Sequence, residues 1–92
     1  MADVITSEQV RAARALLRWE QKDLAEASRV SLPTIKRLEG IAGQLKANDL
    51  TIDALIRAFE TAGLQFIYPN GGGAGVRWRD NPAKLAPSGA GE

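Results

Sequence analysis

The side chains best suited to binding chemistry fall in one short segment, residues 31–37. Ser31 and Thr34 supply hydroxyl groups, and Lys36 and Arg37 supply adjacent cations. Lysine and arginine neutralise phosphates, arginine can grip a guanine, and a hydroxyl group can donate to or accept from a base edge. Side chains of these types are suited to contact with a nucleic acid, and the alternative for the two cations is a solvated helix face.

Residues suited to catalysis are scarce. The chain has 92 residues and contains no histidine and no cysteine. Their absence removes thiol nucleophiles, disulfides, zinc-finger ligands and the side chain best suited to moving protons near neutral pH. We therefore expect one small domain with no enzymatic activity, no metal site and no cofactor.

The net charge of +1 hides an uneven distribution of charge along the chain. Residues 28–48 carry four basic residues and one acidic residue, whereas residues 49–75 carry one basic and three acidic residues. A local cationic surface attracts phosphate because binding releases condensed counterions. An excess of cations on residues 28–48 would favour phosphate binding there, with an affinity that falls steeply as salt rises.

The first element that must position this surface is a helix near the N-terminus. Thr6 can cap it, and Gln9, three residues on, can reach back to complete a capping box. Arg11, Arg14 and Arg18 share one side of this helix because they are three and seven residues apart. We interpret these arginines as solvated surface, with phosphate contact as the alternative.

Two further short helices carry the candidate binding residues. The second helix is predicted from Gln21 to about Ser28, followed by a tight connection at Arg29-Val30. Ser31 is a good N-cap for the third helix, and Pro33 is tolerated because it falls in the first turn. Gly40 is expected to end that helix.

The strongest helical periodicity comes later in the chain. Residues 41–50 hold turn signals and little more than one helical turn, and Thr51 is expected to cap the next helix, which Gly63 closes. Trp19, before the second helix, is predicted to pack in the core. The apolar positions of the later helix, also predicted to be core, are Ile52, Leu55, Ile56 and Phe59.

After residue 63 the apolar period changes from helix to strand. Residues 64–68 and 76–79 are strand-like runs around a glycine-rich loop, which predicts a β-hairpin. That loop lacks the sequence features of a phosphate-binding loop. From Asp80 onward the composition predicts disorder. The fold class is thus mainly α, with four or five helices in residues 1–63, a hairpin in residues 64–79 and a flexible tail in residues 80–92.

Membrane insertion is not expected. No apolar run approaches the roughly 18 residues that a spanning helix needs. The first residues also lack the basic start and apolar stretch of a signal peptide. These features predict a cytoplasmic protein.

The spacing of residues 21–39 resembles that of the lambda-repressor-like helix-turn-helix family, also called the xenobiotic-response-element family. The likeness runs from about Val10 to Phe59, and the hairpin with its Asn-Gly-Gly-Gly loop resembles an extension found in many small bacterial regulators of this type. The matching positions are Gln21, Leu24, Ala25, Val30, Ser31, Thr34, Ile35, Leu38 and Glu39.

The resemblance implies a bundle whose third helix is the recognition helix. In this family the start of that helix enters the major groove, and the start of the second helix meets the phosphate backbone. It also implies a transcriptional regulator, a repressor by expectation, that acts as a homodimer on palindromic double-stranded DNA. The hairpin and residues 51–62 are the candidate dimer surfaces. The candidate DNA-contacting residues are Gln21, Arg29, Ser31, Leu32, Pro33, Thr34, Lys36 and Arg37.

The chain departs from the family pattern at three places. Glu20 stands where the second helix usually has a Ser or Thr cap, and Arg29 stands where the turn usually has glycine. Leu32 and Pro33 lack the amide or guanidinium groups that usually read bases. These departures and the low net charge keep a second hypothesis open: a protein-binding module, similar to an antiactivator or antitoxin, that sequesters a partner protein.

Overall fold

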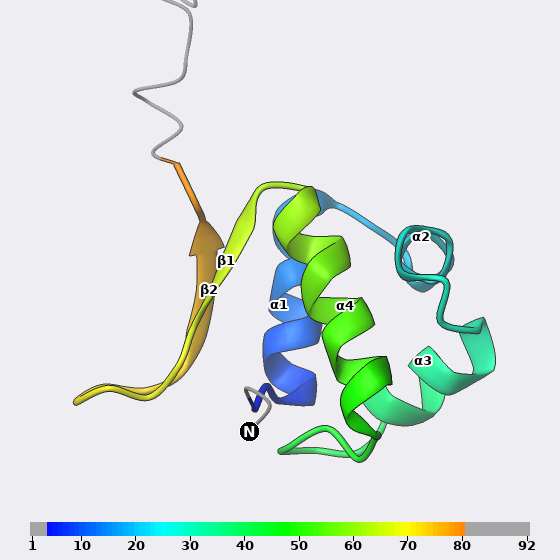
Figure 1. Cartoon of the computed structure of the whole chain (residues 1–92), viewed down its shortest axis with the longest axis horizontal. Coiled ribbons are helices and arrows are strands. Elements are labelled where there is room, and N and C mark those ends of the chain that lie inside the picture. Colours follow the sequence, from blue (N-terminus) through cyan, green and yellow to red (C-terminus); the bar gives the residue numbers. More distant parts are fainter. Residues whose placement is uncertain (1–3, 81–92) are drawn as a thin grey trace, which may run out of the picture.

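The computed structural model describes residues 4–80, and these form four helices and one antiparallel pair of strands (Figure 1). The predicted mainly helical fold with a hairpin is confirmed at this level. Residues 40–48 contain no helix, so the described chain has four helices and no fifth. The predicted tail, apart from Asp80, lies outside the described residues. The elements are α1 (Ser7–Leu17), α2 (Gln21–Ser28), α3 (Leu32–Glu39), α4 (Asp49–Thr61), β1 (Leu64–Ile67) and β2 (Gly75–Trp78).

The predicted capping box at the start of α1 is confirmed. The backbone N–H of Gln9 donates to the Thr6 hydroxyl at 3.1 Å, and the Thr6 N–H donates to Oε1 of Gln9 at 2.9 Å. The amide nitrogen of the same Gln9 donates to the carbonyl oxygens of Ile67, at 3.3 Å, and Gly75, at 2.9 Å. One buried side chain therefore both caps α1 and holds the two strands against it.

The turn between α2 and α3 is built without glycine. Arg29 takes the left-handed conformation, with φ 65° and ψ 15°, and its N–H donates to the Ala25 carbonyl. Ser28 donates its hydroxyl to the Leu24 carbonyl at 2.7 Å and accepts the Val30 N–H at 3.1 Å. These bonds satisfy the turn, although a non-glycine residue in this conformation costs about 1 kcal/mol.

Helix α3 begins and ends where the sequence predicts. Ser31 is its N-cap and accepts the Thr34 N–H at 3.4 Å, with Pro33 in the first turn. Gly40 is the C-cap, but its φ of −81° is right-handed. The helix therefore ends at this glycine without using the left-handed conformation that glycine favours.

The start of α4 differs from the expectation. Asn48, rather than Thr51, is the N-cap: its side-chain oxygen accepts the Thr51 N–H at 2.9 Å, and the helix begins at Asp49. Asparagine is among the strongest N-capping residues, so the extra turn is formed at little cost. At the other end, Gly63 follows the C-cap with φ +106°, a conformation that favours glycine and turns the chain into β1.

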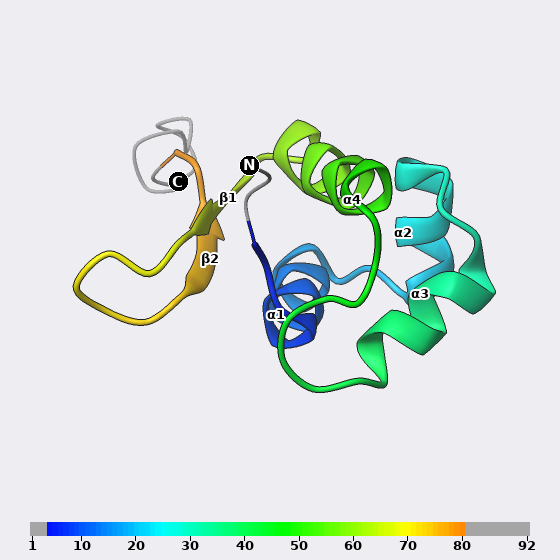
Figure 2. The same cartoon turned by 60° about the horizontal axis from the view of Figure 1, so that its bottom comes forward.

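The core lies between α1, α4 and the hairpin and continues under α2 and α3. Trp19 stacks on Phe59 with ring centroids 5.8 Å apart, and Phe66 meets Phe59 edge-on at the same separation. β1 packs against α4 and β2 against α1, so the hairpin lies on the side of the molecule away from α2 and α3 (Figure 2). The predicted core positions of α4 are confirmed, since Ile52, Leu55, Ile56 and Phe59 are buried.

Candidate nucleic-acid interface

Helix α3 has one buried face and one exposed face. Ile35 and Leu38 are 1% and 2% exposed and anchor the helix in the core. The predicted contact residues lie on or beside the opposite face. Ser31, Pro33, Lys36 and Arg37 are exposed, whereas Leu32 and Thr34 are half-buried. The structure thus brings six of the eight sequence-predicted residues together on α3 and its cap.

An ion pair fixes the end of α3. Nε and Nη2 of Arg14 each lie 2.7 Å from a carboxylate oxygen of Glu39, and Nη1 of Arg14 donates to the Trp19 carbonyl at 3.0 Å. The Glu39 side chain is 5% exposed. The expectation that Arg14 is solvated like Arg11 and Arg18 is therefore wrong, because the last turn of α3 packs against this side of α1. No short-range pattern marks a pair that spans 25 residues of chain.

Gln21 is joined to the same carboxylate. Its amide nitrogen donates to Oε1 of Glu39 at 3.2 Å, and its side chain is half-buried. Glu39 therefore links the first three helices. At the start of α2, Asp23 accepts the Glu20 N–H at 2.8 Å, while the Glu20 side chain remains 75% exposed.

The two hydroxyl groups of α3 form a pair. The Ser31 hydroxyl donates to the Thr34 hydroxyl oxygen at 2.9 Å. Thr34 therefore keeps its own hydroxyl hydrogen, which can be donated to an outside acceptor. This arrangement can present one hydrogen-bond donor to a base edge or a phosphate oxygen.

The cations around α3 are open to solvent. Arg29, Lys36 and Arg37 are exposed, and within residues 4–80 no carboxylate lies close enough to pair with them. Lys22 lies 3.8 Å from Glu20, with both side chains mostly exposed, a weak pair that salt screens. A shallow hollow between the starts of α2 and α3 is lined by Glu20, Gln21, Lys22, Leu32 and Lys36. The surface can therefore neutralise an anionic ligand that spans both helices.

The acidic side chains of the described residues do not gather into a candidate metal site. Residues 4–80 contain no group of three or more potential metal-ligating His, Cys, Asp or Glu side chains. The backbone N–H groups of Glu8 itself and of Gly43 hold the pKa of the Glu8 carboxyl below its ordinary value. That carboxylate accepts the Gly43 N–H at 3.1 Å in an exposed position, so its role is to hold the loop around Gly43 against the start of α1.

None of the helices in these residues is long and apolar enough to cross a membrane.

The chain matches no protein-family model, and a search of curated proteins finds no relative of it. Function is therefore inferred from the geometry of residues 21–39.

Proposed function

We propose that this chain is a sequence-specific, double-stranded DNA-binding transcriptional regulator of the lambda-repressor-like helix-turn-helix class. The observation that carries the proposal is the outward face of α3, a helix anchored by Ile35 and Leu38. On that face Lys36 and Arg37 are exposed, and no carboxylate of residues 4–80 pairs with them. A repressor of this kind inserts residues 31–39 into the major groove and occludes a promoter.

The size of α3 suits the major groove. That groove is about 12 Å wide and admits one α-helix. Arg37 can make a bidentate contact with guanine, Thr34 can donate to a base edge, and Leu32 can contact a thymine methyl. Lys36 is suited to a phosphate contact. Each role uses a side chain that the structure leaves exposed or half-exposed.

The neighbours of α3 are suited to positioning the DNA backbone. Arg29 lies in the turn before α3, and Lys22 lies in the first turn of α2. Gln21, held by Glu39, presents the start of α2 at the edge of the same hollow. Contacts of this kind orient a protein on the duplex without reading its sequence.

The ion pair between Arg14 and Glu39 also favours an anionic ligand. Glu39 is the only acidic residue of residues 28–48, and its charge is neutralised inside the protein. Its carboxylate therefore does not offset Lys36 and Arg37 at the surface. The local positive charge is larger than the net charge of +1 suggests.

Chemical-shift mapping tests this assignment. A labelled sample is titrated with a palindromic duplex from the promoter of its own gene. The amides of residues 31–37 are expected to shift most, with smaller shifts at Gln21 and Arg29. Shifts confined to the hairpin, or absent at low salt, would contradict the assignment.

A second candidate function is a protein-binding module. It is favoured by the same hollow, whose lining includes half-buried Leu32 and exposed Glu20, with Pro33 exposed next to Leu32 in the chain. A leucine among side chains of both charges suits contact with a protein as well as with a base. In that case partner binding would persist in high salt, and duplex DNA would not bind.

A further inference from the structure

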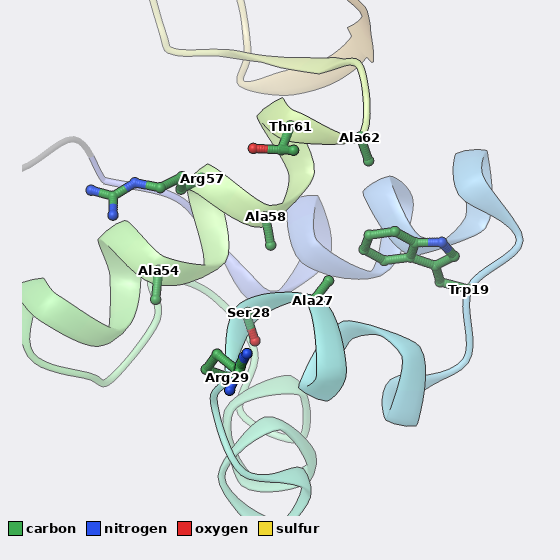
Figure 3. A pocket seen from close by; sticks show the side chains of 9 residues that line it. All are labelled: Trp19, Ala27, Ser28, Arg29, Ala54, Arg57, Ala58, Thr61 and Ala62. Carbon is green, nitrogen blue, oxygen red and sulfur yellow. The ribbon is translucent and has the colours of Figure 1, made fainter.

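A groove runs along the surface between α2 and α4 (Figure 3). Its volume is about 580 Å³. Sites for small molecules usually have volumes of about 300–1,000 Å³, with mostly apolar walls and a few polar groups that fix the orientation of the ligand. The groove is open to solvent on one side, so a ligand bound in it keeps one face in water.

The middle of the groove is lined by methyl groups. Ala54 and Ala58 of α4 and Ala62 at its C-cap are spaced four residues apart, and Ala27 of α2 faces them across the groove (Figure 3). Because alanine side chains are short, the two helices leave space between them that longer side chains would fill. These walls suit the apolar body of a ligand.

The Trp19 ring lies at one end of the groove, beside Ala27 and Ala62 in Figure 3. The ring stacks on Phe59 with centroids 5.8 Å apart, which holds it in place, and it is half-buried, so part of its surface borders the groove. Aromatic rings attract one another in offset or edge-on arrangements beyond the gain from burial. An aromatic body is therefore favoured over an aliphatic one.

The other end of the groove is cationic. Arg29, in the turn after α2, and Arg57, on α4, both line it, and no acidic residue does. Both arginines are exposed, and within residues 4–80 neither forms an ion pair. In Figure 3 Arg29 lies beside Ser28, whereas Arg57 extends into solvent, from where its long side chain can turn toward a ligand. These unpaired cations favour an anion.

Acidic side chains lie beyond the Trp19 end. A second, shallower hollow shares Trp19 and Ala27 with the groove and is also lined by Asp23 and Glu26. A negatively charged group is therefore attracted to the arginine end and repelled from the Trp19 end. The charges give a bound aromatic anion one orientation, with its charged group at the arginines and its ring toward Trp19.

We propose that the groove between α2 and α4 binds a small aromatic anion, either a carboxylate or a phosphate monoester. Its ring packs against Trp19 and the alanines, and its charged group accepts hydrogen bonds from Arg29 and Arg57. Arginine suits both kinds of anion because its guanidinium group can donate two parallel hydrogen bonds. The proposal is tested without DNA, so its failure is distinct from a failure of the proposed function.

Titration of the full chain with naphthoate, followed by NMR, tests the proposal. The chain contains two tryptophans, so their indole N–H signals serve as a probe and an internal control, and Trp78→Phe assigns them. The Trp19 signal is expected to shift, whereas that of Trp78, on β2, should not. Naphthyl phosphate, titrated in parallel, shows which anionic group the arginines prefer. Naphthamide, which has the shape of naphthoate without its charge, should bind about threefold or more weakly.

Substitutions in the lining give the second test. Arg29→Gln and Arg57→Gln should each weaken naphthoate binding about threefold or more, while Arg77→Gln, on the hairpin, should leave it unchanged. Ala27→Glu adds a carboxylate to the groove and should weaken binding more than Ala27→Gln, which adds the same shape without the charge. Circular dichroism checks that each variant is folded. The Arg57 and Ala27 variants keep the test valid if the Arg29 variant does not fold.

Three outcomes would overturn the proposal. The first is a Trp19 signal that neither naphthoate nor naphthyl phosphate shifts at millimolar concentration, including a groove that receives a side chain of a partner protein instead. The second is naphthamide binding as tightly as naphthoate. The third is an affinity for both anions that responds to neither arginine substitution.

Discussion

Arg14 of α1 and Glu39 of α3 form a bidentate ion pair in which both nitrogen–oxygen distances are 2.7 Å. The pair joins the end of α3 to α1, which packs against it. Gln21 of α2 donates to the same carboxylate, so three helices meet at one anion. Their relative positions determine how α3 presents its exposed face.

Arg14→Met should destabilise the fold by about 3 kcal/mol, because it leaves a nearly buried carboxylate without its cation. The double variant Arg14→Met/Glu39→Leu should recover most of this loss, since no charge remains buried. Urea denaturation measures both. The control is Arg11→Met, which removes a pair to Glu8 that is half-exposed on both sides and should cost less than about 1 kcal/mol. Equal costs for the Arg14 and Arg11 variants would refute the proposed role of the buried pair.

Gln9→Ala should destabilise the protein by about 2–3 kcal/mol, because it removes the capping-box acceptor and two hydrogen bonds to the hairpin. Thr6→Ala removes only the cap and should cost about 1 kcal/mol. Hydrogen exchange separates the two effects: amides of β1 and β2 should exchange faster in the Gln9 variant alone. Unchanged exchange in both strands would mean that the hairpin is held by its apolar contacts.

Arg29→Gly should stabilise the protein by about 1 kcal/mol, because φ is 65° at this position and glycine adopts that conformation without steric cost. It should also weaken DNA binding by removing a cation from the turn. Arg18 is a matched control, since it caps α1 with φ 58°. Arg18→Gly should give a similar gain in stability with unchanged DNA affinity. Equal weakening of DNA binding by both variants would place the DNA elsewhere.

The Glu8 carboxylate should make stability depend on pH at the acid end. Hydrogen bonds from its own N–H and from the Gly43 N–H lower its pKa in the folded state relative to the ordinary value of 4.5. The stabilising contribution is therefore fully present above pH 4.5 and is lost as pH falls through the lower folded-state pKa. Glu8→Gln should be less stable than wild type above pH 4.5, and the difference should shrink on acidification. A pH-independent difference would exclude this linkage.

Local sequence signals predict most of the elements because the groups that cap and turn the chain are close in sequence. Thr6 and Gln9, Ser31 and Thr34, and the α4 periodicity are of this kind. The choice of Asn48 over Thr51 is not predictable, since both are good caps within one turn.

Contacts between distant segments were not predictable from the sequence. The spacing of Arg11, Arg14 and Arg18 along one helix predicts a solvated surface. Arg14 is instead paired with Glu39 of α3, which is 25 residues further along the chain. The second role of Gln9 depends on carbonyl groups 58 and 66 residues further on. At the candidate site, the residue types predicted which face of α3 is exposed. The hydrogen bond from Gln21 to Glu39 could be recognised only from the tertiary structure.

The proposal that α3 binds DNA is tested most directly by the salt dependence of duplex binding. On a random duplex Arg37 has no defined guanine to read and is expected to contact phosphate together with Lys22, Arg29 and Lys36. With four phosphate contacts, log K should fall with log salt with a slope of about −3.6. Affinity should then fall about 100-fold between 50 and 200 mM salt. The measurement is fluorescence anisotropy with a random duplex and with the palindromic duplex.

The decisive comparison is between two double variants that remove the same charge. Lys36→Ala/Arg37→Ala should reduce the magnitude of the slope by up to about 2 and abolish preference for the palindrome, whereas Arg77→Ala/Arg79→Ala, on the hairpin, should change neither. The account is contradicted if wild type shows no salt-dependent binding to either duplex, or if the α3 variant binds like wild type.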